Sequence, residues 1–384
     1  RIVARLSDGT FFYTNVYGED SWHQVPSLVM AGDVDAVNYN YKGNDVLLLS
    51  SSFDGLYLVK DDTALVCSNA PKFTSIAVHN ERVFGTVNGV NNQVWFSDDF
   101  DPANWNVSLT EAGYINFCDD LGQALKVVSF AGYLFVFREY GIMRLTAYGD
   151  QSDFVLKKMF TDTGRIYKDT IALCGDSIIF LAEDGLYAFN GYDAVKIGKE
   201  LPQLFNKNGA CAGYLDGEYF LACAIKGDNG NAVDSLVRYD VQTKSISLLS
   251  NVKINCVCPV KVHNGSCVVF SFDGDYANRL GQAATNGKVF SQATKKSYKS
   301  PENILATPYV KAVRCVSLVS KYPLTLRLVA DGKKYEFKVK GSDEMQTIVI
   351  EKSGSVIGFE LETEEQNAYV SPLFVSLDVI RGQE

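Results

Sequence analysis

The segment from Thr170 to Lys199 constrains the fold more than any other part of the chain. It contains four short runs of β-branched, aliphatic and aromatic residues, separated by Gly175-Asp176, Glu183-Asp184-Gly185 and Gly191-Tyr192-Asp193. Because glycine adopts positive φ without a Cβ clash, Asp-Gly suits the tight loop of a β-hairpin. Strands joined by connections this short pair in antiparallel order. The segment therefore predicts a four-stranded antiparallel meander.

Similar segments recur along the chain. The segment from Asp45 to Leu58 repeats the pattern most closely, because it contains a second Asp-Gly-Leu-Tyr. We place the first turn of each copy at Asp45, Glu81, Gly132, Gly175, Gly217 and Gly265, which are 36, 51, 43, 42 and 48 residues apart. A period of about forty residues, with four strands in each copy, is typical of a β-propeller, in which neighbouring sheets cover each other's faces.

The repeats predict an all-β chain with two domains. We expect a six-bladed β-propeller over residues 1–292, whose N-terminal hairpin, residues 1–15, closes the ring with the last blade; residues 16–33 are predicted to be a loop. Residues 293–303 are polar and basic, which indicates a linker. Six further strand-like runs in residues 304–384 predict a small C-terminal β-sandwich.

The charge of the chain excludes some classes of partner. The formal net charge is −9 at pH 7. An acidic surface does not release counterions from nucleic acid phosphates, so we expect no specific binding of DNA. Such a surface also does not suit an anionic membrane. No apolar run approaches the roughly 20 residues that cross a bilayer, so we expect no membrane anchor.

The sequence lacks the motifs of common catalytic and cofactor sites. It contains no Gly-x-Ser-x-Gly elbow, no phosphate-binding P-loop and no dinucleotide fingerprint. His23, His79 and His263 are far apart, and the last two occupy equivalent turn positions, which indicates a structural role. The nine cysteines lie mostly in apolar runs, and the Cys256-Val257-Cys258 pair lacks nearby ligands that would complete a zinc site. We therefore expect reduced thiols, no metal, no cofactor and no enzymatic activity.

Two groups of residues resemble a known family. In the first, Arg82-Val83-Phe84-Gly85 leads to Val94-Trp95-Phe96-Ser97-Asp98 and to Asp101-Pro102-Ala103-Asn104-Trp105; the second runs from Ile171 to Ile197 around Phe-Leu-Ala-x-Asp-Gly-Leu-Tyr. Together they resemble the β-propeller proteins of tail and neck assemblies in tailed bacteriophages and prophages, such as the nozzle of short-tailed phages. The resemblance covers residues 34–290, and a small β-sandwich after the propeller is also similar to that group.

The resemblance implies a structural virion protein. Copies of the chain would form a homo-oligomeric ring in the tail or neck, beside other tail, neck or portal-adaptor proteins, as part of the conduit for DNA ejection. DNA would pass without specific binding, and an acidic wall favours such sliding. The protein would assemble in the cytoplasm of the host bacterium and reside in the tail of the virion.

Elements that interrupt the blade repeat are the candidate assembly contacts. Residues 97–106 form an insertion whose acidic residues lack the ligand spacing of an EF-type calcium loop, so we expect a turn that Trp105 anchors against its blade. The linker is basic in an acidic chain, and its lysines either dock on a neighbour's carboxylates or belong to a solvated tether. The candidate contacts are Asp98, Asp101, Trp105, Lys295, Lys296 and Lys299.

Two other functions remain open. One is a host-surface or glycan-binding propeller at a tail tip, which exposed aromatic side chains on one rim would favour. The other is a secreted propeller enzyme, which a signal sequence upstream of Arg1 would favour.

Overall fold

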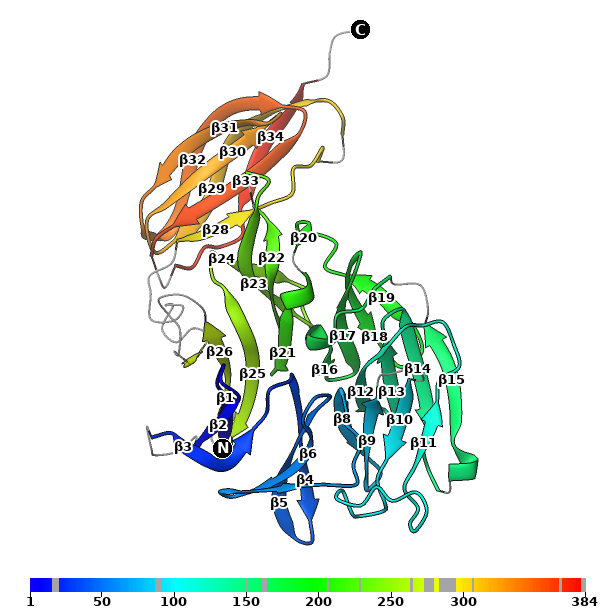
Figure 1. The fold of residues 1–384 in the computed structure, drawn as a ribbon. Helices are drawn as coiled ribbons and strands as arrows, with labels where there is room; N and C mark the ends of the chain where they lie inside the picture. Colours follow the sequence, from blue (N-terminus) through cyan, green and yellow to red (C-terminus); the bar gives the residue numbers. More distant parts are fainter. Residues whose placement is uncertain are drawn as a thin grey trace. The chain divides into compact units, whose positions relative to one another are not determined.

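The computed structural model describes an all-β chain in two compact units, Arg1–Leu280 and Gly281–Glu384 (Figure 1). It describes residues 1–15, 21–87, 92–149, 151–160, 164–205, 207–227, 229–262, 265–272, 280–282, 295–305, 307–365 and 368–380. The boundary between the units therefore falls earlier in the chain than the predicted boundary at residue 292. None of the helices in the described ranges is long and apolar enough to span a membrane.

The strands of the first unit form successive antiparallel sheets in chain order. The first sheets are β1 (Ile2–Arg5), β2 (Thr10–Thr14) and β3 (His23–Val29); β4 (Val34–Tyr41), β5 (Asn44–Ser51), β6 (Gly55–Lys60) and β7 (Thr63–Val66); and β8 (Ser75–His79), β9 (Arg82–Val87), β10 (Gln93–Phe96) and β11 (Gly113–Asn116). The next are β12 (Ala124–Phe130), β13 (Tyr133–Arg138), β14 (Gly141–Thr146) and β15 (Val155–Phe160), and β16 (Ala172–Cys174), β17 (Ser177–Ala182), β18 (Gly185–Phe189) and β19 (Ala194–Ile197).

The series continues with a larger and then a smaller sheet. The larger one contains β20 (Leu204–Phe205), β21 (Cys211–Leu215), β22 (Glu218–Lys226), β23 (Ala232–Asp240) and β24 (Ile246–Ser250), and the smaller one β25 (Ile254–Val262), β26 (Gly265–Phe272) and β27 (Leu280–Gln282). Short 3-10 helices cover Gln151–Asp153, Lys168–Thr170 and Lys207–Gly209. Strands of neighbouring sheets contact each other: β4 with β8, β8 with β12, β16 with β21 and β21 with β25. This arrangement of mostly four-stranded sheets is propeller-like.

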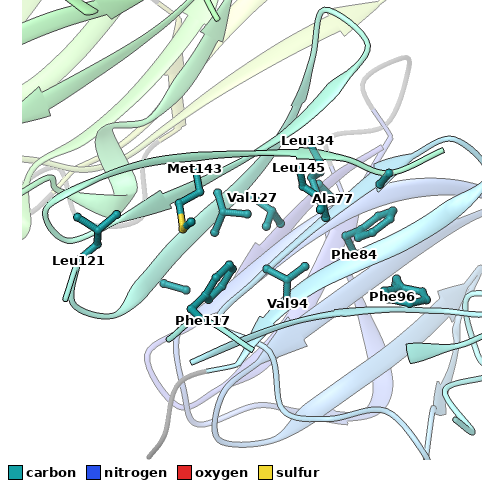
Figure 2. Packing of buried hydrophobic residues seen from close by; sticks show 13 residues of the cluster. Ala77, Phe84, Val94, Phe96, Phe117, Leu121, Val127, Leu134, Met143 and Leu145 are labelled. Atoms are coloured by element: carbon teal, nitrogen blue, oxygen red, sulfur yellow. The ribbon is translucent and has the colours of Figure 1, made fainter. Parts of the chain in front are cut away.

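Each central strand supplies side chains to two hydrophobic cores. In β13, Leu134 and Val136 point into a core shared with the β8–β11 sheet, which Figure 2 shows. Phe135 and Phe137 point the other way, into a core shared with the β16–β19 sheet. Burying a side chain of this size contributes about 1.5–3 kcal/mol. The strand therefore stabilises the stacking of three sheets.

The turns between first and second strands share one conformation in several sheets. Both turn residues have positive φ in Lys42-Gly43, Asn80-Glu81, Ala131-Gly132 and Asp216-Gly217. This is the type I′ turn, whose twist matches that of the strands it joins. The predicted turn positions are confirmed at Glu81, Gly132, Gly175 and Gly217, but Asp45 lies inside β5. The first turn of that sheet is two residues earlier, at Gly43, and Gly265 is the first residue of β26.

The two Asp-Gly pairs lie at equivalent hairpins of different length. Gly55 pairs with Ser51, whereas Gly185 pairs with Ala182, so the first hairpin loop is one residue longer. The φ of Gly55 is +110° and that of Gly185 is +150°, which confirms the predicted positive φ at both positions. A Cβ on Gly185 would lie 2.7 Å from Cε of Lys196, whereas a Cβ on Gly55 would meet no atom within 4 Å.

The N-terminal region differs from the prediction. Residues 16–33 were expected to be a loop, but they contain β3, which pairs with β2. The N-terminal hairpin thus belongs to a sheet of its own, and no pairing in the described residues joins it to β25–β27. Pro26 lies within β3, although proline cannot donate a hydrogen bond to a ladder. It is tolerated because β3 is the edge strand of its sheet.

The second unit consists of two antiparallel sheets with a common core. Its strands are β28 (Lys296–Lys299), β29 (Val310–Ser320), β30 (Leu324–Ala330), β31 (Lys333–Val339), β32 (Ser342–Gly354), β33 (Ile357–Thr363) and β34 (Phe374–Ile380), in the orders β28-β33-β30-β31 and β32-β29-β34. Val316 of β29 and Leu326 of β30 are fully buried in the core that both sheets share. The predicted linker, residues 293–303, is not a tether throughout, because β28 pairs with β33.

We predict that Gly55→Ala destabilises the protein through backbone strain alone. Its Cβ would enter open space, so the expected loss of about 1–3 kcal/mol in the free energy of unfolding comes from the positive φ. Chemical denaturation measures it. Gly209→Ala is the matched control, because that glycine also has open space but no positive φ; an equal loss in both variants would contradict the explanation.

Candidate functional site

The insertion between β10 and β11 is held against β9 by one arginine. Arg82 is 7% exposed, its Nε lies 2.7 Å from Oδ1 of Asp99, and its Nη2 lies 2.9 Å from Oε2 of Glu111. Its Nη1 donates hydrogen bonds of 3.0 Å to the carbonyl oxygens of Ser97 and Glu111. Charge-assisted hydrogen bonds of this kind are stronger than neutral ones. The guanidinium therefore fixes both ends of the insertion, residues 97–112.

Trp105 anchors the middle of the insertion, as predicted. Its side chain is 2% exposed, and its ring centroid lies 4.7 Å from that of Phe73. The indole Nε1 donates a hydrogen bond of 2.8 Å to the carbonyl oxygen of Pro102. Because the ring is buried in this chain, Trp105 cannot itself contact a neighbouring copy; it positions residues that can.

The carboxylates of the insertion stabilise its own turns. Oδ1 of Asp98 accepts hydrogen bonds from the backbone N–H groups of Asp99 (3.1 Å) and Glu111 (3.2 Å). Oδ1 of Asp101 accepts one from the backbone N–H of Ala103 at 3.1 Å. The structure thus brings Asp98 and Asp101 together with Trp105, in roles inside the loop. No group of three metal-ligating side chains occurs there or elsewhere in the described residues.

Corresponding turns of neighbouring sheets lie at one end of the first unit. In a four-stranded meander, the first and third turns are at the same end of the sheet. The side-chain amide of Asn80, in the first turn after β8, donates to the carbonyl oxygen of Ala147, which follows β14 (3.1 Å). A Cβ on Gly191, in the turn after β18, would lie 3.6 Å from the ring of Phe130, next to the first turn of its sheet. The turns of three consecutive sheets therefore form one surface.

This surface carries exposed apolar and aromatic side chains, and we call it the turn face. Within the insertion, Phe100 is 66% exposed and Leu109 is 81% exposed. The third turns of the next two sheets contribute Tyr148 and Tyr192, which are 79% and 68% exposed. With Val107, these residues define the turn face. They come from loops of three neighbouring sheets at the same end of the first unit.

The predicted linker lysines belong to the second unit, apart in sequence from the insertion. Nζ of Lys295 lies 2.7 Å from Oε1 of Glu362, whose other oxygen lies 2.9 Å from Nη1 of Arg327. Hydrogen bonds from Arg327 and Lys295 lower the pKa of the Glu362 carboxyl to about 2. Lys296 and Lys299 lie in β28 and also have interaction partners. Lys295 therefore forms an ion pair with β33, and Lys296 and Lys299 belong to a strand, so a simple tether does not describe these lysines.

First strands of the first unit are also linked by polar side chains. Oδ2 of Asp35, in β4, accepts hydrogen bonds from Oγ of Ser75 (2.6 Å) and from the N–H of Ile76 (3.0 Å), both in β8. The same Ser75 oxygen accepts a hydrogen bond of 3.2 Å from the N–H of Val127 in β12. The side chains of Asp35 and Ser75 are therefore both hydrogen-bonded to a neighbouring sheet.

Two half-buried lysines extend this network. Nζ of Lys126, in β12, donates to the carbonyl oxygen of Ile171 at 3.0 Å. Nζ of Lys168 donates to the carbonyl oxygen of Thr74 at 2.6 Å, which links regions 94 residues apart in sequence. Sequence reasoning missed both, because a lysine that donates to a distant carbonyl leaves no pattern in the sequence.

Buried thiols and imidazole have structural surroundings. Burial raises the pKa of the Cys67 thiol to about 11 and that of Cys174 and Cys223 to about 12, so these free thiols are not reactive thiolates at neutral pH. Burial lowers the pKa of His79, whose Nδ1 lies 2.8 Å from Oγ of Ser129 in the next sheet. His79 thus has the predicted structural turn role; His263 lies outside the described residues.

Arg138 was also missed from the sequence. Its side chain is fully buried, its Nη2 lies 3.1 Å from Oδ1 of Asp119, and its guanidinium stacks 4.5 Å from the ring centroid of Phe117. A single arginine inside the apolar run of β13 is the one signal that the sequence offers for it. The ion pair attaches the β11–β12 connection to the sheet.

Comparisons with known proteins give no family for this chain. No protein-family model matches it, and no curated protein matches its sequence. Among solved structures, the chain is similar to the dihydro-heme d1 dehydrogenase NirN in complex with DHE (TM-score 0.48, 9% identity, 92% of this chain and 74% of that one). It is also similar to PorZ, a surface component of the type-IX secretion system of Porphyromonas gingivalis (TM-score 0.39, 12% identity, 91% and 51%).

A third similar structure is the exo-beta-1,3-galactanase of Phanerochaete chrysosporium (TM-score 0.30, 9% identity, 79% of this chain and 95% of that one). The structural neighbours are propeller-like proteins of unrelated function. Because these TM-scores lie below 0.5, they add no argument about blade number, activity or partners to what the sheets themselves show.

We predict that Arg82→Gln loosens the insertion. The variant loses two ion pairs and leaves the carbonyl oxygens of Ser97 and Glu111 without their donor, which should cost about 1–3 kcal/mol. Hydrogen exchange measured by mass spectrometry should become faster across residues 97–112. Arg238→Gln is the control, because Arg238 pairs with Glu218 in another sheet. Unchanged exchange in the insertion would contradict the anchoring role of Arg82.

We predict that Glu362 contributes a pH-dependent stabilisation to the second unit. Its folded pKa, about 2, lies below the ordinary value of 4.5, so this contribution is fully present above pH 4.5 and is lost as the pH falls toward 2. Glu362→Gln should therefore lower the melting temperature at neutral pH and reduce its decline between pH 4.5 and 2. A parallel decline in both proteins, measured by calorimetry, would exclude this contribution.

Proposed function

We propose that the chain is a structural virion protein of a tailed phage, in which several copies form a ring in the tail or neck around the path of the ejected DNA. In this proposal the first unit is a β-propeller and the second a small β-sandwich. The successive sheets favour seven blades rather than the expected six, because β1–β3 pair with each other. Other tail, neck or portal-adaptor proteins would be the partners, with assembly in the host cytoplasm.

The turn face is the observation that carries this proposal. Phe100 and Leu109 project from an insertion that Arg82 and Trp105 hold in place, so their exposure is a property of an ordered loop. When a partner covers an apolar side chain that an ordered loop holds in water, the free energy of the system falls. The insertion is also an addition to the blade repeat. An assembly contact at the insertion can therefore form without disturbing the stacking of sheets.

The polar groups of the first unit support a role without catalysis. Asp35, Ser75, Lys126 and Lys168 are polar groups near the first strands, and each is used in a bond between sheets. Groups in such bonds hold the sheets together, and we propose that the chain is not an enzyme and needs no cofactor. The net charge of −9 repels the phosphates of DNA, so it supports a conduit wall along which DNA slides rather than a surface that binds it.

A second candidate function is the binding of a glycan at a tail tip. Tyr148 and Tyr192 expose aromatic rings at the same end of the first unit. Aromatic rings at one rim were the feature expected of such a propeller. The two candidates differ in what the turn face contacts: a second copy of the chain in the first, a host polysaccharide in the second.

We predict that the double variant Phe100→Asp, Leu109→Asp disrupts the oligomer. Two carboxylates would have to be desolvated in the contact, so the mass in light scattering should fall toward that of one chain. The matched control is Leu65→Asp, because Leu65 is 59% exposed but lies in the regular strand β7. An oligomer that survives the double variant, or a wild-type protein with the mass of a single chain, would contradict the assembly proposal.

A further inference from the structure

Arg144 differs from the other arginines that the structure describes. The others make ion pairs or hydrogen bonds with neighbouring groups: Arg1, Arg5, Arg82, Arg138, Arg165, Arg238, Arg314 and Arg327. Arg144 has neither within the described residues, and its buried Nε has no hydrogen-bond partner there. In a chain with nine more acidic than basic residues, a half-buried guanidinium without an acidic partner is unexpected.

Two tyrosine rings lie near this guanidinium, and a lysine is the cross-strand partner of Arg144. Its Cζ lies 4.3 Å from the ring centroid of Tyr133 in β13 and 6.0 Å from that of Tyr192 in the turn after β18. Arg144 pairs with Lys157 of β15, and cross-strand partners project from the same face of a sheet. The site therefore lies between the β12–β15 and β16–β19 sheets, where two cations share one face and Tyr192 belongs to the turn face.

The aromatic rings do not replace a hydrogen-bond acceptor. A guanidinium has five N–H donors in a planar fork that matches the two oxygens of a carboxylate. A cation over a tyrosine ring is attracted by the negative face of the ring, but this contact leaves the in-plane donors unused. An anion that reaches the fork would satisfy them. Arg144 is only half-buried, and Tyr192 beside it is 68% exposed.

We propose that Arg144, Tyr133, Tyr192 and Lys157 form a binding site for a sugar carboxylate, such as that of a uronic or sialic acid residue in a surface polysaccharide. The guanidinium holds the carboxylate in a bidentate pair, Lys157 adds a second positive charge, and Tyr192 supplies a ring face for the apolar side of the sugar. One carboxylate among neutral hydroxyl groups suits two cations on an acidic protein, whereas a polyphosphate would be repelled by the net charge.

This inference deepens the second candidate function and is independent of the assembly proposal. A glycan that contacted the turn face through tyrosines alone would bind whether or not it carried a charge. The proposed site instead requires the carboxylate. The experiment therefore compares acidic and neutral sugars on the same protein, and light scattering records its oligomeric mass separately.

The test measures binding to the full chain by isothermal titration calorimetry. The probes are galacturonic acid, N-acetylneuraminic acid, neutral maltotriose and acetate. We expect a Kd of about 1 mM or lower for at least one acidic sugar, and binding at least tenfold weaker, about 1.4 kcal/mol, for maltotriose and acetate. Arg144→Gln should abolish the binding of the acidic sugar, and Tyr192→Ala should weaken it about tenfold. Arg165→Gln is the control with unchanged affinity.

The outcomes separate the alternatives. Absence of binding for both acidic sugars would overturn the proposal, and so would an affinity that Arg144→Gln leaves unchanged. Equal affinity for maltotriose would overturn the carboxylate site but retain a neutral glycan site, whereas equal affinity for acetate would reduce the site to an anion site without a sugar. If Arg144→Gln does not fold, as judged by circular dichroism, Tyr192→Ala and Lys157→Gln carry the test.

Discussion

The structure of the first unit depends on one constraint: its central sheets are apolar on both faces, so each needs a neighbouring sheet on either side. The side chains of β13 alternate between two cores, and those of the β16–β19 sheet likewise enter one core with Phe135 and another with Tyr219. A single sheet of this kind is unstable in water, because both of its apolar faces stay exposed. Stacking in chain order removes that exposure with the shortest connections.

Polar bonds near the first strands complement this apolar stacking. Inner strands at a sheet edge present backbone groups that no further strand pairs, and unpaired buried groups are costly. Asp35, Ser75, Lys126 and Lys168 satisfy some of these groups from the neighbouring sheets. These four polar side chains are thus part of the scaffold. The exposed side chains of the turn face and Arg144 are left for interactions with other molecules.

The sequence predicted those features that depend on local residues. Turn glycines, four-strand repeats and the anchoring indole of Trp105 could be found because each follows from neighbours in the chain. Edge strands were harder to predict. β3 contains Pro26, and β28 lies in a polar run at Lys296. An edge strand needs neither a strongly apolar pattern nor a paired N–H group at every residue. The roles of Arg82, Arg138 and Lys168 depend on partners distant in sequence, often backbone carbonyls, which no residue type reveals. The virion role of the chain stays a proposal.

The order of the sheets has a consequence for the synthesis of the protein. Each sheet of the first unit consists of consecutive strands, so it can form as soon as they leave the ribosome, which adds about 5–20 residues per second. For the few seconds until the next sheet appears, the face that will pack against that sheet is exposed apolar surface. The part of the nascent chain most exposed to aggregation therefore moves steadily along the molecule, one sheet behind the ribosome, and a chaperone that protects it would need to follow the same path.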